Sequence, residues 1–465
     1  MSDLFEQLKA IAGPKGFSTD PAEIAPHLEE WRSKYTGASP LLLKPASTQE
    51  VSAILALCHQ TGTAVVPQGG NTGLVGAQIP FHNEVLISLA RLNQIRSLDR
   101  HDDSLIAEAG VVLATAQKHA DEANLLLAPS LASEGSATIG GLISSNAGGV
   151  NVLRYGMMRE QVLGLEVVLA DGRVLKGLRT LRKDNTGYDL KQLFIGAEGT
   201  LGIITAAALK LLPKPSERAT AFVAVPDMRA ATHLLARLQE HTNGLLNAFE
   251  VIARSGLELV LTHIPGTREP FAAPSPWYVL CEASGIKGVG EAFLSGLESA
   301  LADGFAGDVV IASSEAQRDS LWRLREAMSE AQKLEGPSLK HDISVPVSAA
   351  AEFIDTAIAA VAARLPEARP VPFGHLGDGN LHFNFQMAKD GDPQRYLARW
   401  DEIQQLVHDI VHDFGGSFSA EHGVGVMKRE ALKRYKSPAE IDLMRVLKRA
   451  LDPKAILNPG KLVPD

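Results

Sequence analysis

The sequence predicts an α+β protein with more than one domain. Apolar runs such as 85–88 are typical of strands, whereas apolar residues in 49–60 recur at the spacing of one helix face. Glycine-rich loops interrupt these elements, and strands and helices mixed in this way are typical of α+β enzymes. At roughly 150 residues per domain, the 465 residues correspond to about three structural units.

The individual elements follow from local patterns, taken in chain order. The expected strands are 64–66, 85–88, 167–170, 221–225 and 277–281. The expected helices are 49–60, 114–123, 230–241 and 321–334. The segment 211–216 carries two prolines, and we expect a domain boundary there.

Composition excludes several classes of protein. Hydrophobic residues make up 45% of the chain and charged residues 21%, which is typical of a folded globular protein rather than a disordered one. A formal net charge of -9 argues against a nucleic-acid partner, because such a partner needs a basic face. No apolar run reaches the roughly 18 residues that a membrane span requires.

Cysteine content and the N-terminal sequence favour the cytoplasm. Cys58 and Cys281 are the only cysteines and form no CxxC motif, so we expect two buried structural thiols. Few cysteines are typical of a reducing compartment. The first residues, MSDLFEQLKAIAG, lack a basic segment followed by an apolar block. We therefore expect a cytoplasmic protein.

Three glycine-rich segments are candidates for a ligand site. Residues 64–76 read AVVPQGGNTGLVG, a pattern in which backbone N–H groups can converge on an anion. Residues 129–149 consist mainly of small side chains, which let a planar ligand approach the backbone, and 194–205 reads FIGAEGTLGIIT. A tight turn and a packed loop remain alternatives. Neither GxGxxG nor GxxxxGK[ST] occurs, which disfavours a nicotinamide Rossmann enzyme.

In this order the three segments resemble the FAD-binding domain of the vanillyl-alcohol oxidase and p-cresol methylhydroxylase superfamily. The resemblance implies that 67–74 surrounds the pyrophosphate, whereas 138–149 and 198–203 contact the flavin and the adenosine. Since 67–76 contains no histidine or cysteine, it implies non-covalent FAD. The residues expected at the cofactor are Pro67, Gly69, Gly70, Asn71, Thr72, Gly73, Leu74, Pro129, Thr138, Gly140, Gly141, Ser145, Asn146, Gly149, Glu198, Gly199, Ile203 and Asn458.

Histidines and a carboxylate form a second candidate site. In VPFGHLGDGNLHFNF, a Gly-Asp-Gly turn separates His375 from His382, and strand alternation puts His382 and Asn384 on one face. Such a pair suits a metal or an oxyanion, and one core and one surface histidine is the alternative. In GGSFSAEHGVG, Glu421 adds the carboxylate of a three-ligand metal site with an open position, and His422 is a candidate base.

These segments resemble FAD-linked D-2-hydroxyacid dehydrogenases, and so does the closing LDPKAILNPGKL. The resemblance implies that His375, His382 and Glu421 bind a divalent metal, for which zinc is the expected ion. It also implies that His422 is the general base and that Asn384 touches the substrate.

A cationic segment bears on the substrate. Arg325 and Ser329 are four residues apart on an expected helix, and Lys340 follows a Gly-Pro pair. Taken alone, this pattern indicates a solvated helix. The resemblance to D-2-hydroxyglutarate dehydrogenases implies instead that the three hold the distal carboxylate of a diacid, with Ser329 where threonine is usual. Each charge-assisted hydrogen bond would contribute roughly 1.5–3 kcal/mol.

The resemblance also implies an architecture. Residues 1–215 form a p-cresol methylhydroxylase-type FAD-binding domain of two subdomains. Residues 216–420 form an antiparallel-sheet cap domain that binds the substrate, and the helical segment 421–465 returns to the FAD domain.

The expected reaction is oxidation of D-2-hydroxyglutarate to 2-oxoglutarate by hydride transfer to flavin N5. D-Lactate, D-malate or glycolate is the alternative substrate. The expected acceptor is an electron-transfer flavoprotein or a quinone, which would bring peripheral membrane association, and a homodimer remains open. Two other classes stay open at this point, a metal-dependent hydrolase without flavin and a non-catalytic flavin-binding subunit.

Overall fold

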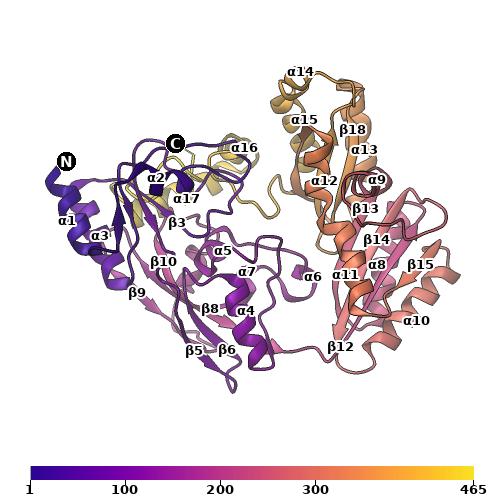
Figure 1. Ribbon diagram of the computed structural model, residues 1–465, viewed down its shortest axis with the longest axis horizontal. Helices are drawn as coiled ribbons and strands as arrows, with labels where there is room; N and C mark the ends of the chain where they lie inside the picture. The colour runs from indigo at the N-terminus through magenta and orange to yellow at the C-terminus, as the bar shows by residue number, and fades with distance from the viewer. Residues whose placement is uncertain (1, 465) are drawn as a thin grey trace. The chain divides into compact units, whose positions relative to one another are not determined.

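The computed structural model describes residues 2–464, which fold into two compact units (Figure 1). Within the described residues, the first unit comprises 2–149, 156–214 and 421–464. The second unit comprises residues 215–420 together with the short segment Val150–Tyr155. The chain passes from the first unit to the second at Lys214, inside the proline-containing segment 211–216.

The first unit begins with a small mixed sheet. Its strand order is β1(Phe17–Ser18)-β2(Leu42–Leu43)-β4(Val85–Ser88)-β3(Val65–Gln68), and β2, β4 and β3 run parallel. Helices α1(Ser2–Ala12) and α3(Thr48–Thr61) contact each other beside it. Helix α3 begins where the Ser47 side chain accepts the Glu50 N–H, and it ends at Gly62 in the left-handed conformation, so its bounds follow from ordinary capping.

The second sheet of the first unit has five antiparallel strands. Their order is β5(Ile95–Asp99)-β6(Ser104–Glu108)-β10(Ile203–Lys210)-β8(Val162–Val168)-β9(Val174–Gly177). The central strand β10 is buried over all but its last residue, as the run IITAAAL predicts for a strand covered on both faces.

Short elements and the C-terminal segment complete this unit. Helices α16(Arg429–Tyr435) and α17(Pro438–Leu451) follow the return of the chain, and a β-bridge joins Leu457 to Val65 of β3. The remaining elements before residue 215 are α2(Pro21–Ile24), η1(Ala25–His27), α4(Leu113–Glu122), β7(Leu125–Leu126), α5(Ile139–Ser145), α6(Val152–Tyr155), α7(Met158–Gln161), η2(Leu190–Leu193) and β11(Leu212–Pro213), of which α6 belongs to the second unit.

The second unit is built on one antiparallel sheet. Its order is β15(Asp308–Ile311)-β12(Glu217–Val225)-β14(Trp277–Gly285)-β13(Leu246–Ala253)-β18(Arg369–His375)-β19(Asn380–Gln386)-β16(Ser338–Leu339), and β17(Asp342–Ser344) also pairs with β19. The helices are α8(Met228–His241), α9(Arg254–His263), α10(Val289–Ala302), α11(Glu315–Glu326), α12(Met328–Glu335), α13(Ala350–Arg364), α14(Pro393–Leu397) and α15(Trp400–Asp413), with short turns η3(Val347–Ala349) and η4(Leu376–Asp378).

Alternation along these strands creates two separate cores. Phe249 and Val251 pack on one face with α8, α10, α13 and α15, whereas Ile252 packs on the other face with α9, α11 and α12. Because successive side chains point to opposite faces, Glu250 shares the face of Ile252. The hairpin follows the same rule, since Phe383 belongs to the first core and its neighbours His382 and Asn384 to the opposite face.

The α+β class predicted from the sequence is confirmed, and every expected strand overlaps a strand. One expected helix is interrupted. The segment 321–334 is not continuous, because it is divided at Ala327 (φ -75°, ψ -2°) into α11 and α12. Cys58 and Cys281 are buried as expected, and burial raises the pKa of both thiols. Among the described residues, no helix is long and apolar enough to cross a membrane.

Candidate active site

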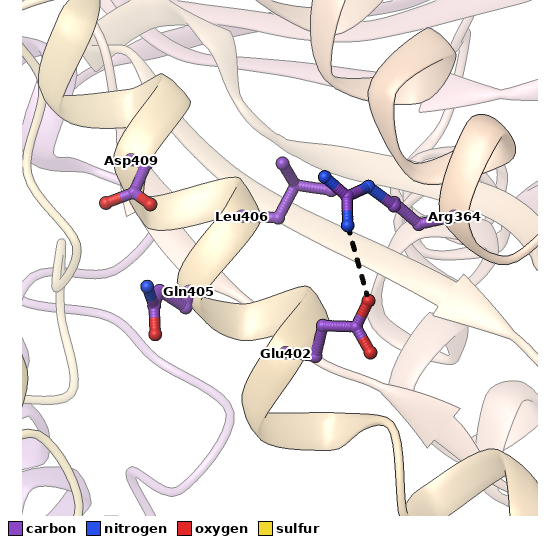
Figure 2. Close-up of a pocket in the computed structure, with 5 residues that line it drawn as sticks. All are labelled: Arg364, Glu402, Gln405, Leu406 and Asp409. Atoms are coloured by element: carbon purple, nitrogen blue, oxygen red, sulfur yellow. Dashed lines mark ion pairs between the residues drawn. The ribbon is translucent and has the colours of Figure 1, made fainter.

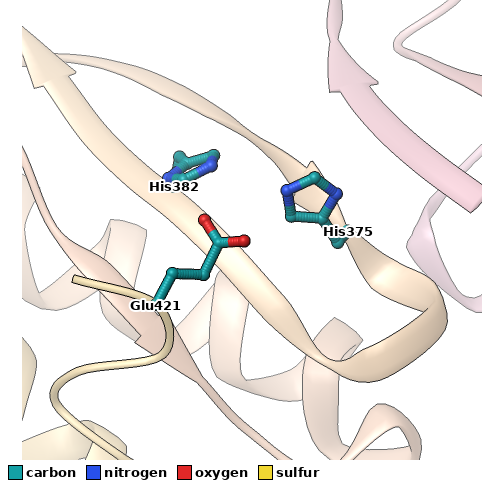
Figure 3. A group of neighbouring side chains, drawn as sticks. All are labelled: His375, His382 and Glu421. Atoms are coloured by element: carbon teal, nitrogen blue, oxygen red, sulfur yellow. The ribbon is translucent and has the colours of Figure 1, made fainter. Parts of the chain in front are cut away.

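The histidine hairpin of the second unit forms the centre of the candidate site. His375 ends β18 and His382 lies on β19, and their ring centroids are 5.7 Å apart (Figure 3). The turn between them needs Gly379, which has a φ of +82° and lies so close to the Val345 carbonyl that a Cβ would be 2.1 Å from the oxygen. The predicted Gly-Asp-Gly turn therefore brings the two imidazoles together.

A buried carboxylate that the sequence analysis missed fixes one of these histidines. Glu250 of β13 lies opposite His375 of β18 and accepts its Nδ1–H at 2.5 Å. Burial raises the pKa of Glu250, but positive charge at His375 and Arg325 outweighs this effect and holds the pKa at about 2. With Nδ1 committed to Glu250, a metal held by His375 would have to bind through Nε2.

Arg325 reaches the same carboxylate from α11. Its Nε donates to Glu250 at 2.6 Å, and its guanidinium lies 4.9 Å from the centroid of the Phe373 ring. In the described part of the chain, no hydrogen bond uses its two Nη groups. Arg325 therefore links the predicted carboxylate-binding segment to the histidine hairpin and keeps two donors for an added ligand.

The residues predicted to contact the substrate differ in how deeply they are buried and in what they bind. Arg325 is 8% exposed, whereas Ser329 is exposed on α12 beyond the break at Ala327, so the expected shared face of one helix is wrong. Lys340 is half-buried between β16 and β17. Asn384 is buried, accepts the His341 N–H at 3.0 Å and donates to Gln332 at 2.9 Å. Both ends of its amide thus have partners within the protein.

The predicted FAD segments meet within the first unit. A Cβ on Gly69 would lie 2.4 Å from Thr138 Oγ1, and one on Gly70 would lie 2.0 Å from the Ser136 carbonyl oxygen. A Cβ on Gly199 would likewise lie 2.5 Å from Pro67 Cγ. Side chains at these positions would separate the segments, so the glycines are needed for the close contact.

Unpartnered polar atoms in these segments fit a bound cofactor. The described residues offer no hydrogen-bond partner to the buried atoms Thr138 Oγ1, Asn71 Oδ1 and Asn458 Oδ1. Buried polar atoms are normally paired, so three such atoms among the predicted FAD contacts fit a ligand site. Thr72, Gly73 and Leu74 complete the loop after Asn71, whose side chain donates to the Pro26 and Glu29 carbonyls.

Several predicted FAD contacts serve the protein itself. Gly140 packs against Ala109, where a Cβ would lie 2.6 Å from the alanine methyl, and Ile203 is part of the first unit's core. Ser145 Oγ donates to the Gly141 carbonyl, and Asn146 Oδ1 accepts the Arg159 N–H, while Pro129 accepts from Gln117. The Glu198 carboxylate accepts hydrogen bonds from the backbone N–H groups of residues 424 and 425, so it is engaged within the protein.

Glu421 and His422 lie in the returning segment of the first unit. The Glu421 carboxylate accepts the N–H of Gly149 at 2.9 Å, which ties it to the second glycine-rich segment. Figure 3 draws Glu421 together with His375 and His382. The two histidines belong to the second unit and the glutamate to the first.

A surface hollow on the second unit offers no comparable chemistry. It has a volume of about 340 Å³ and lies on α13 and α15, where Arg364 and Glu402 pair at 4.0 Å (Figure 2). Gln405, Leu406 and Asp409 complete its lining. None of the predicted site residues lines it, and its one cation, Arg364, is paired with Glu402.

Comparison with known proteins identifies the family of this chain. The C-terminal domain of FAD linked oxidases matches residues 214–462, and an FAD binding domain matches residues 39–177. The mitochondrial D-2-hydroxyglutarate dehydrogenase of Arabidopsis thaliana is 41% identical, over 98% of this chain and 80% of the relative. The chain belongs to the FAD-linked oxidase family. It is an FAD-dependent dehydrogenase of 2-hydroxyacids.

Other relatives define the range of this family. The Bos taurus D-2-hydroxyglutarate dehydrogenase is 42% identical, over 96% of this chain and 81% of the relative. A Schizosaccharomyces pombe protein named as a putative D-lactate dehydrogenase is 38% identical, over 96% of this chain and 86% of the relative. The structure of p-cresol methylhydroxylase matches with a TM-score of 0.77 at 17% identity, over 99% of this chain and 96% of that one, which shows the same fold.

These findings set aside two alternatives and correct one prediction. Neither a flavin-free hydrolase nor a non-catalytic flavin subunit is consistent with the family. The prediction of a cytoplasmic location is wrong, because the plant and mammalian relatives are mitochondrial proteins. It had rested on few cysteines and on a first segment without a basic stretch followed by an apolar block, and both features are compatible with more than one compartment.

Proposed function

We propose that this family member oxidises D-2-hydroxyglutarate to 2-oxoglutarate, with non-covalent FAD and a divalent metal. The observation that carries the proposal is the chain of contacts from His375 through Glu250 to Arg325. Through these two contacts the Arg325 guanidinium is linked to His375, and its two Nη groups remain as hydrogen-bond donors. A substrate with a hydroxyacid group at one end and a carboxylate at the other fits such an arrangement, whereas lactate has no second carboxylate.

The proposed ligands of the metal are His375, His382 and Glu421. Two imidazoles and one carboxylate leave a coordination position open, and this donor set suits zinc and other first-row divalent ions. Bound FAD would take up the hydride from the substrate carbon, and a bound metal would lower the pKa of the substrate hydroxyl.

The side chains supply orientation and proton transfer. Glu250 holds the His375 ring in one tautomer, and Arg325 holds the distal carboxylate with Lys340 and Ser329 as proposed partners. His422 is the proposed base for the hydroxyl proton. Asn384 contributes through the backbone of residue 341, which its amide fixes. We further propose that the reduced protein passes electrons to an electron-transfer flavoprotein or a quinone.

Anaerobic reduction by substrate tests the proposal directly. Purified holoenzyme is mixed with D-2-hydroxyglutarate, D-lactate or D-malate, and the visible flavin band is followed. We expect the band to disappear much faster with D-2-hydroxyglutarate, and metal analysis to find one divalent ion per chain. Faster loss with D-lactate would transfer the proposal to the activity named for the Schizosaccharomyces pombe relative. A band unchanged by all three acids, in protein with its metal bound, would refute it.

Loss of the Glu250 charge is expected to weaken metal binding. Substituting Glu250→Gln leaves an acceptor for the His375 Nδ1–H but removes the charge, and changes to such outer partners typically cost about 10–100-fold in metal affinity. Zinc titration of the apo-protein with a competing chelator measures the effect. The matched control is Glu282→Gln, because Glu282 is another buried carboxylate of this unit and binds Arg318 and Trp322. Equal zinc affinity in both variants would contradict the role of Glu250.

A further inference from the structure

The loop 421–425 (EHGVG) carries two of the proposed functional side chains and has no regular secondary structure. Gly423 and Gly425 adopt positive φ values of 79° and 51°. Glycines of this kind give a loop access to many backbone conformations. A base at residue 422 needs a fixed position, so something outside the loop has to hold its backbone.

Glu198 makes the contacts that hold this backbone. Its Oε1 accepts the Val424 N–H at 2.7 Å, and its Oε2 accepts the Gly425 N–H at 2.8 Å. A Cβ on Gly423 would lie 2.5 Å from Glu198 Oε1, so only glycine permits the approach. One carboxylate thus binds two successive amides immediately after His422.

Glu198 is itself held at both ends of its backbone. It adopts a positive φ of 50°, which is uncommon for a residue with a side chain. Its N–H donates to the Ser144 carbonyl at 2.8 Å, and its carbonyl accepts from Asn458 Nδ2 at 2.7 Å. Asn458 donates also to Ala77, so the carboxylate extends from a rigid base.

The two ends of the loop are fixed within the first unit. Glu421 accepts the Gly149 N–H, and Glu198 binds residues 424 and 425, so His422 lies between the two anchors. Burial raises the pKa of Glu198 to about 7, although the two N–H donors and Lys428 lower it. Burying a carboxylate is costly, and a loop that only had to be covered could use a neutral acceptor.

We propose that Glu198 is a positioning residue for His422, acting by clamping the backbone of residues 424 and 425. This inference rests on the proposed role of His422. It gives the Glu198 segment a function besides the cofactor contact that the resemblance implies. No contact between Glu198 and the substrate is required.

Substitution Glu198→Gln in the holoenzyme tests the clamp with two readouts. Hydrogen exchange of the peptide that spans residues 420–427 is expected to accelerate about tenfold or more, which corresponds to the loss of one charge-assisted hydrogen bond. The kcat for reduction by D-2-hydroxyglutarate is expected to fall by a similar factor, about tenfold, with KM nearly unchanged, because the clamp positions the base and does not bind substrate. Glu198→Ala, which keeps no acceptor, should show larger effects on both.

The matched control is Glu166→Gln. Glu166 is a partly buried carboxylate of the same unit, and its partners Thr48, Arg96 and Thr205 all lie outside the loop 421–425. This variant should lose thermal stability while exchange of residues 420–427 and kcat stay at wild-type values. Gly423→Ala is a second probe, because its methyl would displace Glu198 without removing it, and it should reproduce the effects of Glu198→Gln.

Unchanged exchange and unchanged kcat in Glu198→Gln would overturn the inference. So would a fall in kcat that only matches a fall in flavin content, because Glu198 would then act through the cofactor. Failure of the proposed function is distinguishable from both. In that case wild-type flavin is not reduced by any of the acids, while hydrogen exchange still reports on the clamp.

Discussion

Substituting Arg325→Ala is expected to lower kcat/KM for D-2-hydroxyglutarate by about a hundredfold or more relative to that for D-lactate. The two Nη groups of Arg325 remain for a ligand after its Nε binds Glu250. Two charge-assisted hydrogen bonds contribute roughly 1.5–3 kcal/mol each, and about 1.4 kcal/mol corresponds to tenfold. Anaerobic flavin reduction with both acids measures the ratio.

The same substitution should destabilise the fold, because the buried Glu250 carboxylate would lose its arginine partner. Removing one member of a buried pair typically costs about 3–5 kcal/mol. The ratio of kcat/KM between the two substrates is therefore the decisive readout, because a loss of protein stability lowers the activity with both acids equally. Arg325→Lys keeps the charge without the planar fork and should recover only part of the preference.

Arg323→Ala is the matched control for this prediction. Arg323 lies on the same helix and donates to the Pro265 carbonyl at the surface. Its loss should leave the ratio between the two acids unchanged. If Arg325→Ala also keeps the wild-type ratio, Arg325 serves only to hold Glu250, and the diacid proposal loses its support.

Substituting His422→Ala is expected to lower kcat by about 10²–10⁴-fold, the range typical for loss of a general base. FAD content and thermal stability should change little, because the loop remains anchored by Glu198 and by Gly149. Pre-steady-state reduction of the flavin separates the chemical step from substrate binding.

A control histidine and a rescue experiment sharpen this prediction. His119 is exposed on α4, and its replacement by alanine should have no effect on flavin reduction. Added imidazole should restore part of the rate of flavin reduction to His422→Ala by taking the place of the missing side chain. A variant that retains full kcat would show that the hydroxyl proton leaves by another route.

The parts of the site that were predictable are those encoded in short segments. Gly379 allows the tight turn that brings His375 and His382 together, and this requirement is local. The glycines at 69, 70 and 199 likewise occupy positions where a side chain would clash with its neighbours. Motifs of this kind were sufficient to recognise the family and its cofactor.

The contacts that tune the site were not predictable in the same way. Glu250 is 125 residues from His375, and with Asn247 it is one of two polar residues in the otherwise apolar strand LNAFEVIA. Only the register of β13 against β18 places it opposite the histidine. The break at Ala327 was also invisible, because the apolar pattern continues through it and the residues on both sides, such as Leu324 and Met328, pack in the same core.

The sequence by itself therefore determined the fold class, the glycine-rich segments of the first unit and the histidine hairpin, because each depends on neighbouring residues and their backbone freedom. Tertiary structure alone decided which carboxylates form hydrogen bonds to the histidine hairpin and to the loop 421–425. Glu250 meets His375 through strand pairing, and Glu198 meets Gly425 across 227 positions of the chain. The physical reason is that a buried charge is stable only beside its partners, and the fold rather than the local sequence chooses those partners.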